Sequence, residues 1–327
     1  MHSNNSWARG FMALFAIVLT MGLALAACPA EAAPFAYVTN EHSNNVSVID
    51  TATNTLVATI PVGTIPFAVA VTPDGTHVYV TNDGSNNVSV IGTATNTVVK
   101  TIPVGKNPVG VAVTPDGTHV YVANEGSGSV SVIARPGNTV VATIPVGTGP
   151  FGVAITADGT HAYATNINSA NVSVIHTATN TVAGLPIPVG MDPVGVAVTP
   201  DGTQVYVANS GSNNVSVIHR PGNTVVQTIP VGTTPGVGVA VTPDGTHVYV
   251  TNSVSNNVSV IHRPGNTVVK AIPVGTTPVG VAVTPDGTHV YVANNNSDTI
   301  SVIARPGNTV VKTIPVGTGP VGVAIGP

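Results

Sequence analysis

The stretch Pro278-Val-Gly-Val-Ala-Val-Thr-Pro-Asp-Gly-Thr-His-Val-Tyr-Val-Ala-Asn294 is the template of this chain, because variants of it recur along nearly the whole length. Its first half also closes the sequence from Pro320, and its second half opens the repeated region at Phe35. One tyrosine marks each copy, at steps of 42 or 43 residues: Tyr37, Tyr79, Tyr121, Tyr163, Tyr206, Tyr249 and Tyr291. Seven copies at this period are typical of a propeller or a solenoid.

Each copy contains four short runs of β-forming residues. In the second copy they cover residues 67–72, 77–82, 88–91 and 97–102, and all are rich in Val, Ile, Thr and Tyr. Thr-Pro-Asp-Gly-Thr follows the first run, where Pro presets φ, Asp bonds its own backbone and Gly accepts a positive φ. The runs are apolar at almost every position, which favours sheets packed on both faces over a half-solvated sheet.

The turn between the third and fourth runs has two alternative sequences. It reads Thr-Ala-Thr-Asn in three copies and Arg-Pro-Gly-Asn in the four copies that supply Arg135, Arg220, Arg263 and Arg305. The second sequence fits a type II turn with Pro and Gly at its centre. Because two sequences fill one slot, we expect a surface turn with no further role.

The two ends of the repeated region complement each other. The first copy lacks its opening run, and the chain ends with a spare one, Pro320-Val-Gly-Val-Ala-Ile325. Pairing this run beside residues 36–40 completes the seventh sheet and removes the exposed edges that a linear array leaves. We therefore predict an all-β fold, a seven-bladed β-propeller over residues 34–327. Its blades are four-stranded and antiparallel, and the C-terminal strand closes the ring on the N-terminal blade.

Residues 1–33 differ in kind from the repeats. A polar start precedes an uncharged apolar run over residues 11–27, and small residues follow. This pattern predicts a signal peptide and hence export to the periplasm, the cell surface or the medium; the alternative is a retained membrane anchor. Ala30-Glu31-Ala32 suits an ordinary signal peptidase. Leu25-Ala26-Ala27-Cys28 resembles a bacterial lipobox, so a lipid on Cys28 is the alternative, and it is the only membrane contact that we expect.

Charged residues are scarce, at 7% of the chain against about 25% in an average domain. The formal net charge is −4, which argues against nucleic acid as a partner, because phosphate binding needs Lys and Arg. Cys28 is the only cysteine, so no disulfide forms within the chain. We expect no cofactor.

Three tetrapeptides, Tyr37-Val-Thr-Asn40, Tyr79-Val-Thr-Asn82 and Tyr249-Val-Thr-Asn252, resemble the signature of the YVTN β-propeller repeat family. The other copies read Tyr-Val-Ala-Asn or Tyr-Ala-Thr-Asn, and the resemblance covers residues 35–327. It implies a seven-bladed propeller in an exported or surface protein. The chain is also similar to the propellers of lactonases and quinoprotein dehydrogenases, which keeps an enzyme open as a second class of function.

The runs expected to line the channel offer no ligands for a metal. Between their ends they contain only Val, Ala, Gly, Phe and Ile. A metal-dependent lactonase-type site needs several oxygen ligands near the axis, so we expect no metal site. Five histidines recur after Asp-Gly-Thr on different blades, and we interpret them as solvated turn residues: His77, His119, His161, His247 and His289.

Deviations from the repeat map to one rim, around the channel mouth. Lys106 and Asp192 stand in connections between copies, whereas Glu41, Asp83 and Glu125 follow the signature asparagine in the first three copies. Our hypothesis is that these five residues form a weak polar recognition face. The alternative is a scatter of charges that only keeps a charge-poor protein in solution.

The function predicted from these residues is that of a non-catalytic propeller outside the cytoplasm. It would bind or scaffold a protein or a glycan through its rim. The alternative is a propeller enzyme of the lactonase or quinoprotein-dehydrogenase type.

Overall fold

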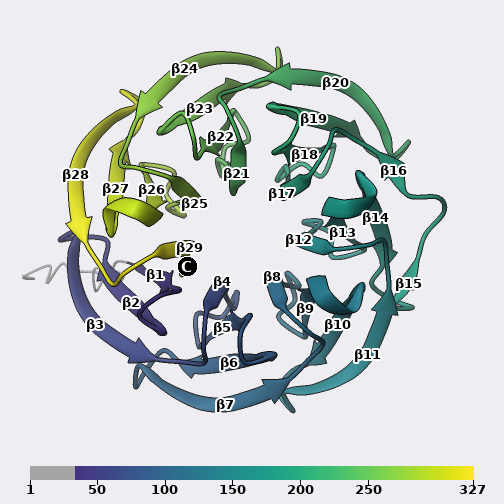
Figure 1. Ribbon diagram of the computed structural model, residues 1–327, viewed down its shortest axis with the longest axis horizontal. Coiled ribbons are helices and arrows are strands. Elements are labelled where there is room, and N and C mark those ends of the chain that lie inside the picture. Colours follow the sequence, from purple (N-terminus) through teal and green to yellow (C-terminus); the bar gives the residue numbers. More distant parts are fainter. Residues whose placement is uncertain (1–33) are drawn as a thin grey trace, which may run out of the picture. The chain divides into compact units, whose positions relative to one another are not determined.

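The computed structural model describes residues 34–327, which form seven antiparallel sheets set as blades around a common axis (Figure 1). The predicted seven-bladed propeller with four-stranded blades is confirmed. The leader predicted over residues 1–33, with its cleavage site and the lipidation of Cys28, lies outside the described residues. Within residues 34–327 no helix is long and apolar enough to cross a membrane.

Each blade runs outward from an innermost strand beside the axis. The innermost strands all begin at a proline: β4 (Pro66–Val71), β8 (Pro108–Val113), β12 (Pro150–Ile155), β17 (Pro193–Val198), β21 (Pro235–Val241), β25 (Pro278–Val283) and β29 (Pro320–Ile325). The second strands all end at the signature asparagine: β1 (Phe35–Asn40), β5 (His77–Asn82), β9 (His119–Asn124), β13 (His161–Asn166), β18 (Gln204–Asn209), β22 (His247–Asn252) and β26 (His289–Asn294).

The third and fourth strands complete each blade. The third strands are β2 (Asn45–Asp50), β6 (Asn87–Gly92), β10 (Ser129–Ala134), β14 (Asn171–His176), β19 (Asn214–His219), β23 (Asn257–His262) and β27 (Thr299–Ala304). The outermost strands are β3 (Thr55–Pro61), β7 (Thr97–Pro103), β11 (Thr139–Pro145), β20 (Thr224–Pro230), β24 (Thr267–Pro273) and β28 (Thr309–Pro315), and in the fourth blade the pair β15 (Thr181–Val182) and β16 (Ile187–Pro188). Three short 3-10 helices follow second strands: η1 (Glu125–Ser127), η2 (Ile167–Ser169) and η3 (Asn295–Ser297).

The ring closes as the sequence predicts. Strand β29 pairs antiparallel with β1, and the register sets Ala36 opposite Ile325 and Val38 opposite Val323. The first blade is therefore built from both ends of the repeated region (Figure 1). Closure leaves every innermost strand with a neighbour on each side of the ring, so no sheet is left without a packing partner.

The core lies between neighbouring blades rather than inside one sheet. Between the first and second blades, for example, Tyr37, Val48 and Ile60 pack against Val78 and Val80. The second and third strands are buried on both faces, which explains their continuous runs of Val, Ile and Tyr. Each buried valine contributes roughly 1.5–3 kcal/mol, so many small contacts replace the scarce aromatic residues.

The first hairpin turn behaves as its sequence predicts. In the second blade the Gly75 N–H donates to the Thr72 carbonyl at 2.8 Å, and Gly75 has a φ of 66°. The Asp74 carboxylate accepts from the Thr76 N–H at 3.1 Å, which fixes the turn locally.

The second hairpin turn differs from the predicted type II turn. In Arg135-Pro-Gly-Asn138 the Arg135–Pro136 peptide is cis, and the residue with positive φ is Asn138, at 51°, rather than Gly137. The Thr-Ala-Thr-Asn turns use the same solution, because Asn96 also has a φ of 51°. The shared asparagine tolerates the left-handed region, so it sets the turn whichever residues precede it.

The signature tetrapeptide links strands and blades. Asn82 is fully buried, and its amide donates to Asn87 Oδ1 at 2.7 Å and to Ser89 Oγ at 2.9 Å on the third strand. The Thr81 hydroxyl donates to the Val109 carbonyl of the next blade at 2.7 Å. Copies with alanine in this position, such as Ala123, lack a hydroxyl for this bond. The signature is therefore structural.

Candidate functional site

The two faces of the ring carry different turns. We call the mouth face the one formed by the turns between second and third strands and by the connections between blades. The latch face is formed by the turns between first and second strands and between third and fourth strands. The structure places all five predicted site residues on the mouth face: Glu41, Asp83, Lys106, Glu125 and Asp192.

Glu125 and Asp83 stand in equivalent turns of the third and second blades on the mouth face. Glu125 opens η1, and its backbone N–H donates to the Asn107 carbonyl at 2.9 Å, while the Asp83 N–H donates in the same way to the Ile65 carbonyl. Burial raises the pKa of Glu125, and the negative charge of nearby Asp83 raises that pKa further. Such a carboxyl exchanges protons closer to neutral pH than an ordinary one, which suits acid–base chemistry.

Lys106 belongs to the same sector of the mouth face. Its backbone N–H donates to Ser127 Oγ of η1 at 2.7 Å, and its carbonyl accepts from the Gly126 N–H at 3.1 Å. These two bonds fasten the connection before the third blade to the helix that begins with Glu125. The Lys106 side chain is exposed, so its ammonium is free to meet a ligand at the mouth.

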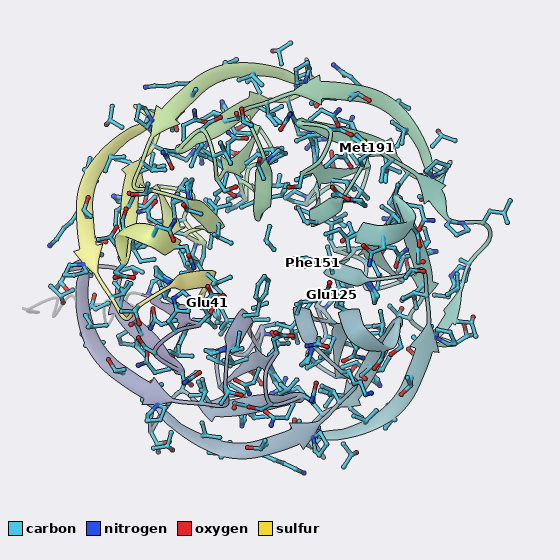
Figure 2. The ribbon with its side chains drawn as sticks, viewed as in Figure 1. Glu41, Glu125, Phe151 and Met191 are labelled. Atoms are coloured by element: carbon cyan, nitrogen blue, oxygen red, sulfur yellow. The ribbon has the colours of Figure 1, made fainter. Side chains whose placement is uncertain are left out.

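The other two predicted residues lie apart from this sector. Glu41 accepts from the Asn295 amide at 3.1 Å and lies 3.3 Å from His42 Nε2 (Figure 2). Asp192 lies between the fourth and fifth blades, next to the exposed Met191, and its carbonyl accepts from the Ser210 N–H at 2.9 Å. Among the described residues no ion pair joins any two of the five, and the recognition face that they would form stays a prediction.

Two aromatic rings beside the axis were not anticipated from the sequence. Phe67 on β4 and Phe151 on β12 meet edge to face with their centroids 5.5 Å apart, although β8 lies between their blades (Figure 2). The innermost strands approach closely enough that a Cβ on Gly110 would lie 2.3 Å from the Phe151 carbonyl. The sequence signal for this contact is that phenylalanine stands in place of valine at this position in two copies. The mouth end of the ring thus has a carboxyl with a raised pKa, Glu125, and two aromatic rings on the innermost strands.

The donor set does not fit a metal-dependent form of a lactonase site. From residue 34 to residue 327, no three or more His, Cys, Asp or Glu side chains gather closely enough to hold a metal ion.

Four aspartates on the latch face are paired with arginines across blades. Each arginine of an Arg-Pro-Gly-Asn turn reaches back to the aspartate in the first turn of the preceding blade. The Nη2–Oδ2 distances are 3.2 Å for Arg135–Asp74, 3.8 Å for Arg220–Asp158, 3.2 Å for Arg263–Asp201 and 3.3 Å for Arg305–Asp244. The prediction of a surface turn with no further role is wrong for these four turns, because the guanidinium groups bridge neighbouring blades.

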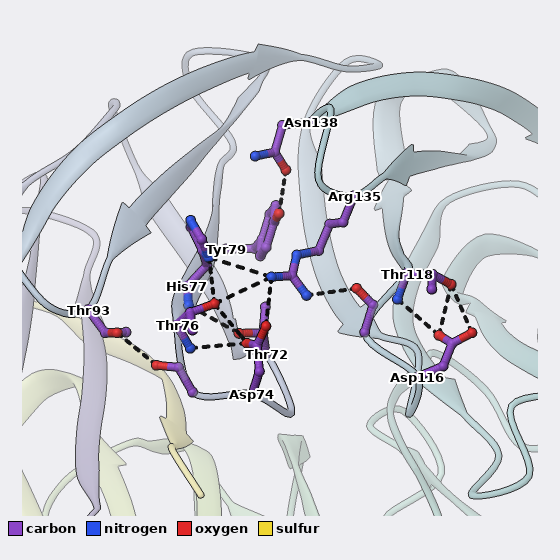
Figure 3. A network of polar contacts seen from close by, with 12 residues as sticks. Thr72, Asp74, Thr76, His77, Tyr79, Thr93, Asp116, Thr118, Arg135 and Asn138 are labelled. Carbon is purple, nitrogen blue, oxygen red and sulfur yellow. Dashed lines mark hydrogen bonds and ion pairs between the residues drawn. The ribbon is translucent and has the colours of Figure 1, made fainter.

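Hydrogen bonds keep the latch carboxylates ionised. The hydrogen bond from the Thr72 hydroxyl lowers the pKa of Asp74 most, and hydrogen bonds from Thr76 and Arg135 lower it further (Figure 3). The Thr156 hydroxyl is likewise the first cause that lowers the pKa of Asp158, to about 2. A carboxylate held this firmly in its charged form cannot exchange protons near neutral pH, so these groups are structural.

The recurring histidines are partly buried turn neighbours. His77 Nδ1 lies 2.8 Å from the Thr76 hydroxyl, and His161 stacks at 4.6 Å against His176 of the adjacent strand. Burial lowers the pKa of His161, and His176 lowers it further. The recurring histidines are therefore less exposed to solvent than the sequence interpretation assumed, and each lies on a different blade.

The chain matches a family model described as lactonase, 7-bladed beta-propeller, over residues 28–143, 139–270 and 224–314. These overlapping segments span most of the sequence. The chain therefore belongs to the seven-bladed β-propeller lactonase family.

Solved structures give the same fold. Kuenenia stuttgartiensis hydrazine synthase is 27% identical, with a TM-score of 0.76 over 83% of this chain and 92% of that chain. A functionally unknown protein from Desulfotomaculum acetoxidans is 22% identical, with a TM-score of 0.79 over 89% and 98%. The periplasmic gluconolactonase PpgL of Pseudomonas aeruginosa is 20% identical, with a TM-score of 0.75 over 90% and 99%. No curated protein matches the chain.

The prediction of a non-catalytic binding or scaffolding module is wrong. The family is one of lactonases, and a structure with the same fold is named a gluconolactonase, which supports the alternative of a propeller enzyme. The sequence argument gave most weight to the apolar innermost strands. Turns on a rigid scaffold are common carriers of catalytic groups, and the carboxyl with the raised pKa, Glu125, belongs to a turn at the mouth.

Proposed function

We propose that the protein hydrolyses a lactone at the mouth face, with Glu125, Asp83 and Lys106 as its polar groups. The observation that carries this proposal is the match to the lactonase family across residues 28–314. The local geometry supports it, because a carboxyl with a raised pKa and an exposed cation occupy the same sector. Phe67 and Phe151 beside the axis supply the apolar contact that small-ligand sites usually contain.

Glu125 acts as the general base in this reaction. Its carboxylate takes a proton from water while the water oxygen attacks the lactone carbonyl carbon, and its raised pKa makes it the stronger base. The Lys106 ammonium stabilises the oxyanion of the tetrahedral intermediate. When the ring C–O bond breaks, protonated Glu125 returns the proton to the leaving alkoxide, and the product is the open hydroxy acid. Asp83 keeps the proton affinity of Glu125 high through its charge.

The test is hydrolysis of a panel of γ- and δ-lactones, including glucono-δ-lactone, followed in a pH-stat with the purified protein. We expect Glu125→Gln to lower kcat/KM by about 10²–10⁴-fold, because an amide takes no proton. Asp298→Asn is the matched control. Asp298 lies in the corresponding turn of the seventh blade, and asparagine keeps an acceptor for the Gly319 N–H, now at 2.9 Å.

Two results would overturn the proposal. One is a native protein that adds nothing to the spontaneous hydrolysis of any lactone in the panel. The other is a Glu125→Gln variant that matches the native kcat/KM while Asp298→Asn also stays at the native level.

We propose further that the repeat units are of the YVTN kind. The support is the three Tyr-Val-Thr-Asn copies together with the bonds that Thr81 and Asn82 make across strands and blades. The sequence left two enzyme types open, and the family match favours the lactonase over the quinoprotein dehydrogenase.

Export is also a proposal. It is supported by the three-part pattern of residues 1–33, and one protein of the same fold is named a periplasmic enzyme. The mass of the mature protein separates a chain cut after Ala32 from one that begins at a lipidated Cys28, and a chain that keeps Met1 contradicts both. A protein or glycan partner and the absence of nucleic-acid binding stay predictions.

A further inference from the structure

Arg135 shows how the latch face holds a guanidinium group (Figure 3). Its Nη1 donates to the Gly117 carbonyl at 2.7 Å, and its Nη2 donates to Asp74 Oδ2 at 3.2 Å. The same Nη2 lies 3.5 Å from the Thr76 hydroxyl and 3.5 Å from His77 Nδ1. One carboxylate, one carbonyl, one hydroxyl and one imidazole thus surround the group, contributed by two neighbouring blades.

Between the third and fourth blades this arginine is missing. Thr177 occupies the position of Arg135 one repeat later, and its hydroxyl donates to the Gly159 carbonyl at 2.5 Å. The threonine side chain ends there and does not extend to Asp116 of the third blade. Asp116 accepts hydrogen bonds only within its own turn, from Thr114 and Thr118. Among residues 34–327 no Lys or Arg nitrogen lies within 4.0 Å of its carboxylate.

A cavity of about 560 Å³ occupies the place of the missing side chain. Its lining contains the repeat equivalents of every group that surrounds Arg135: Asp116, Thr118, His119 and Gly159. Tyr121 and Asn180 also line it and are joined by a hydrogen bond of 2.6 Å. Ala157 lines it too, where every other complete copy of this turn has proline, so the cleft has additional room.

We propose that this cleft binds a guanidinium group, carried by a small molecule or by an arginine side chain of a peptide. The molecule itself provides the precedent, because four other junctions hold a guanidinium group between an aspartate and a glycine carbonyl. The planar fork of a guanidinium presents several N–H donors at fixed angles, which a compact ammonium does not. The volume lies within the roughly 300–1,000 Å³ of small-molecule sites.

Electrostatics favour a cation in this cleft. The hydrogen bond from Thr114 is the first cause that lowers the pKa of Asp116, so the group is a carboxylate at neutral pH. Asp158, which also lines the cleft, is already engaged by Arg220 on its other side at 3.8 Å. Asp116 is therefore the carboxylate that remains for a ligand.

The first blade also has threonine in this position, Thr51, which faces Asp286 of the seventh blade. There the Thr51 hydroxyl donates to the Pro34 carbonyl, at the start of the described chain, in place of a glycine carbonyl. The proposal concerns the cleft beside Thr177, where the cavity is lined by the glycine carbonyl's residue, Gly159, and by Ala157. It predicts one binding site per chain.

The experiment is a calorimetric titration of the full chain at low salt with agmatine, with N-acetyl-arginine amide and with butylamine. We expect agmatine or the arginine amide to bind at one site per chain, and butylamine to bind at least tenfold more weakly, about the ratio that one charge-assisted hydrogen bond provides. Stronger binding of agmatine assigns a small molecule, and stronger binding of the arginine amide assigns a peptide. Absence of binding by both overturns the proposal.

Three variants locate the site. Asp116→Asn should weaken binding about tenfold or more by removing the charge. The triple change Thr177→Arg, Ala178→Pro and Thr179→Gly copies the arginine turn into the fourth blade, so its own guanidinium should fill the cleft and abolish binding. The matched control makes the same change at Thr93, Ala94 and Thr95, where the preceding blade has chain ends instead of an aspartate turn, and should bind like the native chain.

Circular dichroism and the melting temperature show that each variant is folded before it is titrated. Native-like binding by the folded Asp116→Asn variant, or by the fourth-blade triple variant, contradicts the proposed site. Equal loss of binding in the triple variants of the second and fourth blades also contradicts it, because only the fourth-blade change can reach the cleft.

Discussion

Four carboxylates on the latch face lie beside guanidinium groups, whereas Glu125 on the mouth face is influenced by the carboxylate of Asp83. Asp74 accepts from Arg135 at 3.2 Å and from the hydroxyls of its own turn, so its pKa lies well below the ordinary value. Glu125 is partly buried, and this burial and the charge of Asp83 raise its pKa. Each residue stands in a turn of the repeated unit. The charged group across the nearest blade junction adds to the lowering of the pKa of Asp74 and to the raising of the pKa of Glu125.

Under the proposed function, this difference separates the carboxylates that stabilise the fold from those that take part in the reaction. On the latch face four aspartates are paired with arginines, and removal of such a pair should cost stability. On the mouth face the negative charge of Asp83 raises the pKa of Glu125, the carboxyl that the proposed reaction would use. The closing strand β29 belongs to neither face, and its loss gives the change in stability with which the effects on the two faces are compared.

Removal of the closing strand should have the largest effect. A chain truncated after Ile314 lacks β29, including Val321, which is 2% exposed, and leaves β1 with an unpaired edge. No arginine latch joins the seventh and first blades, because Thr51 stands in that position. We expect a loss of about 5 kcal/mol or more, the sum for several buried apolar side chains, measured by urea unfolding. Truncation after Ile325 is the control and should unfold at nearly the native urea concentration.

Loss of one latch should have the next largest effect. Arg263 has a side chain only 11% exposed, and it donates to the Gly245 carbonyl at 2.9 Å and to Gln204 Oε1 at 3.0 Å as well as to Asp201. Arg263→Met should therefore cost about 1.5–3 kcal/mol in the free energy of unfolding. Lys106→Met on the mouth face should change it by no more than about 0.5 kcal/mol. Equal changes in the two variants would erase the distinction between the faces.

The two faces should respond to pH with opposite sign. The pKa of Asp158 falls from 3.8 in the unfolded chain to about 2 in the fold, so its contribution is present above pH 3.8 and is lost as the pH falls toward 2. Glu125 has a raised pKa, so it favours the folded state below its unfolded value of 4.5 and disfavours it as the pH rises through the folded value.

Melting temperatures from pH 2 to pH 7 measure this contrast. Asp158→Asn should flatten the acid limb of the stability curve, whereas Glu125→Gln should raise the melting temperature at pH 7 and leave it unchanged near pH 3. Parallel curves for the native chain and both variants would show that neither carboxyl is perturbed as described.

The fold could be predicted from the sequence because its determinants are local or periodic. The tyrosine spacing gives the blades, and the spare run from Pro320 gives the closure. The latches could not be predicted in this way, because Arg135 and Asp74 are 61 residues apart and meet only across a blade junction. The alternation of the two turn sequences was visible, but its meaning depends on the residue in the preceding blade.

The role of the candidate site residues stays a prediction. Asp83, Glu125 and Lys106 stand out in the sequence because they break the repeat, and they lie in turns and connections of the second and third blades. Their coupling depends on burial and on the distance between blades, which no periodic pattern reports. The contact between Phe67 and Phe151 was equally out of reach, since it joins blades that are not neighbours.

The smallest expected effect comes from adding a latch where the molecule has none. Changing Thr177, Ala178 and Thr179 to Arg, Pro and Gly should pair the new guanidinium with Asp116 and raise the free energy of unfolding by about 0.5–1 kcal/mol, the upper range for a partly exposed ion pair. The same change at Thr93, Ala94 and Thr95 should give no gain, because no aspartate turn precedes it. Urea unfolding of both variants at low and high salt measures the difference, and the gain should shrink at high salt if it comes from the ion pair. An equal gain in both variants would attribute the stabilisation to the Pro-Gly turn itself, and the arginine would then have no part in holding adjacent blades together.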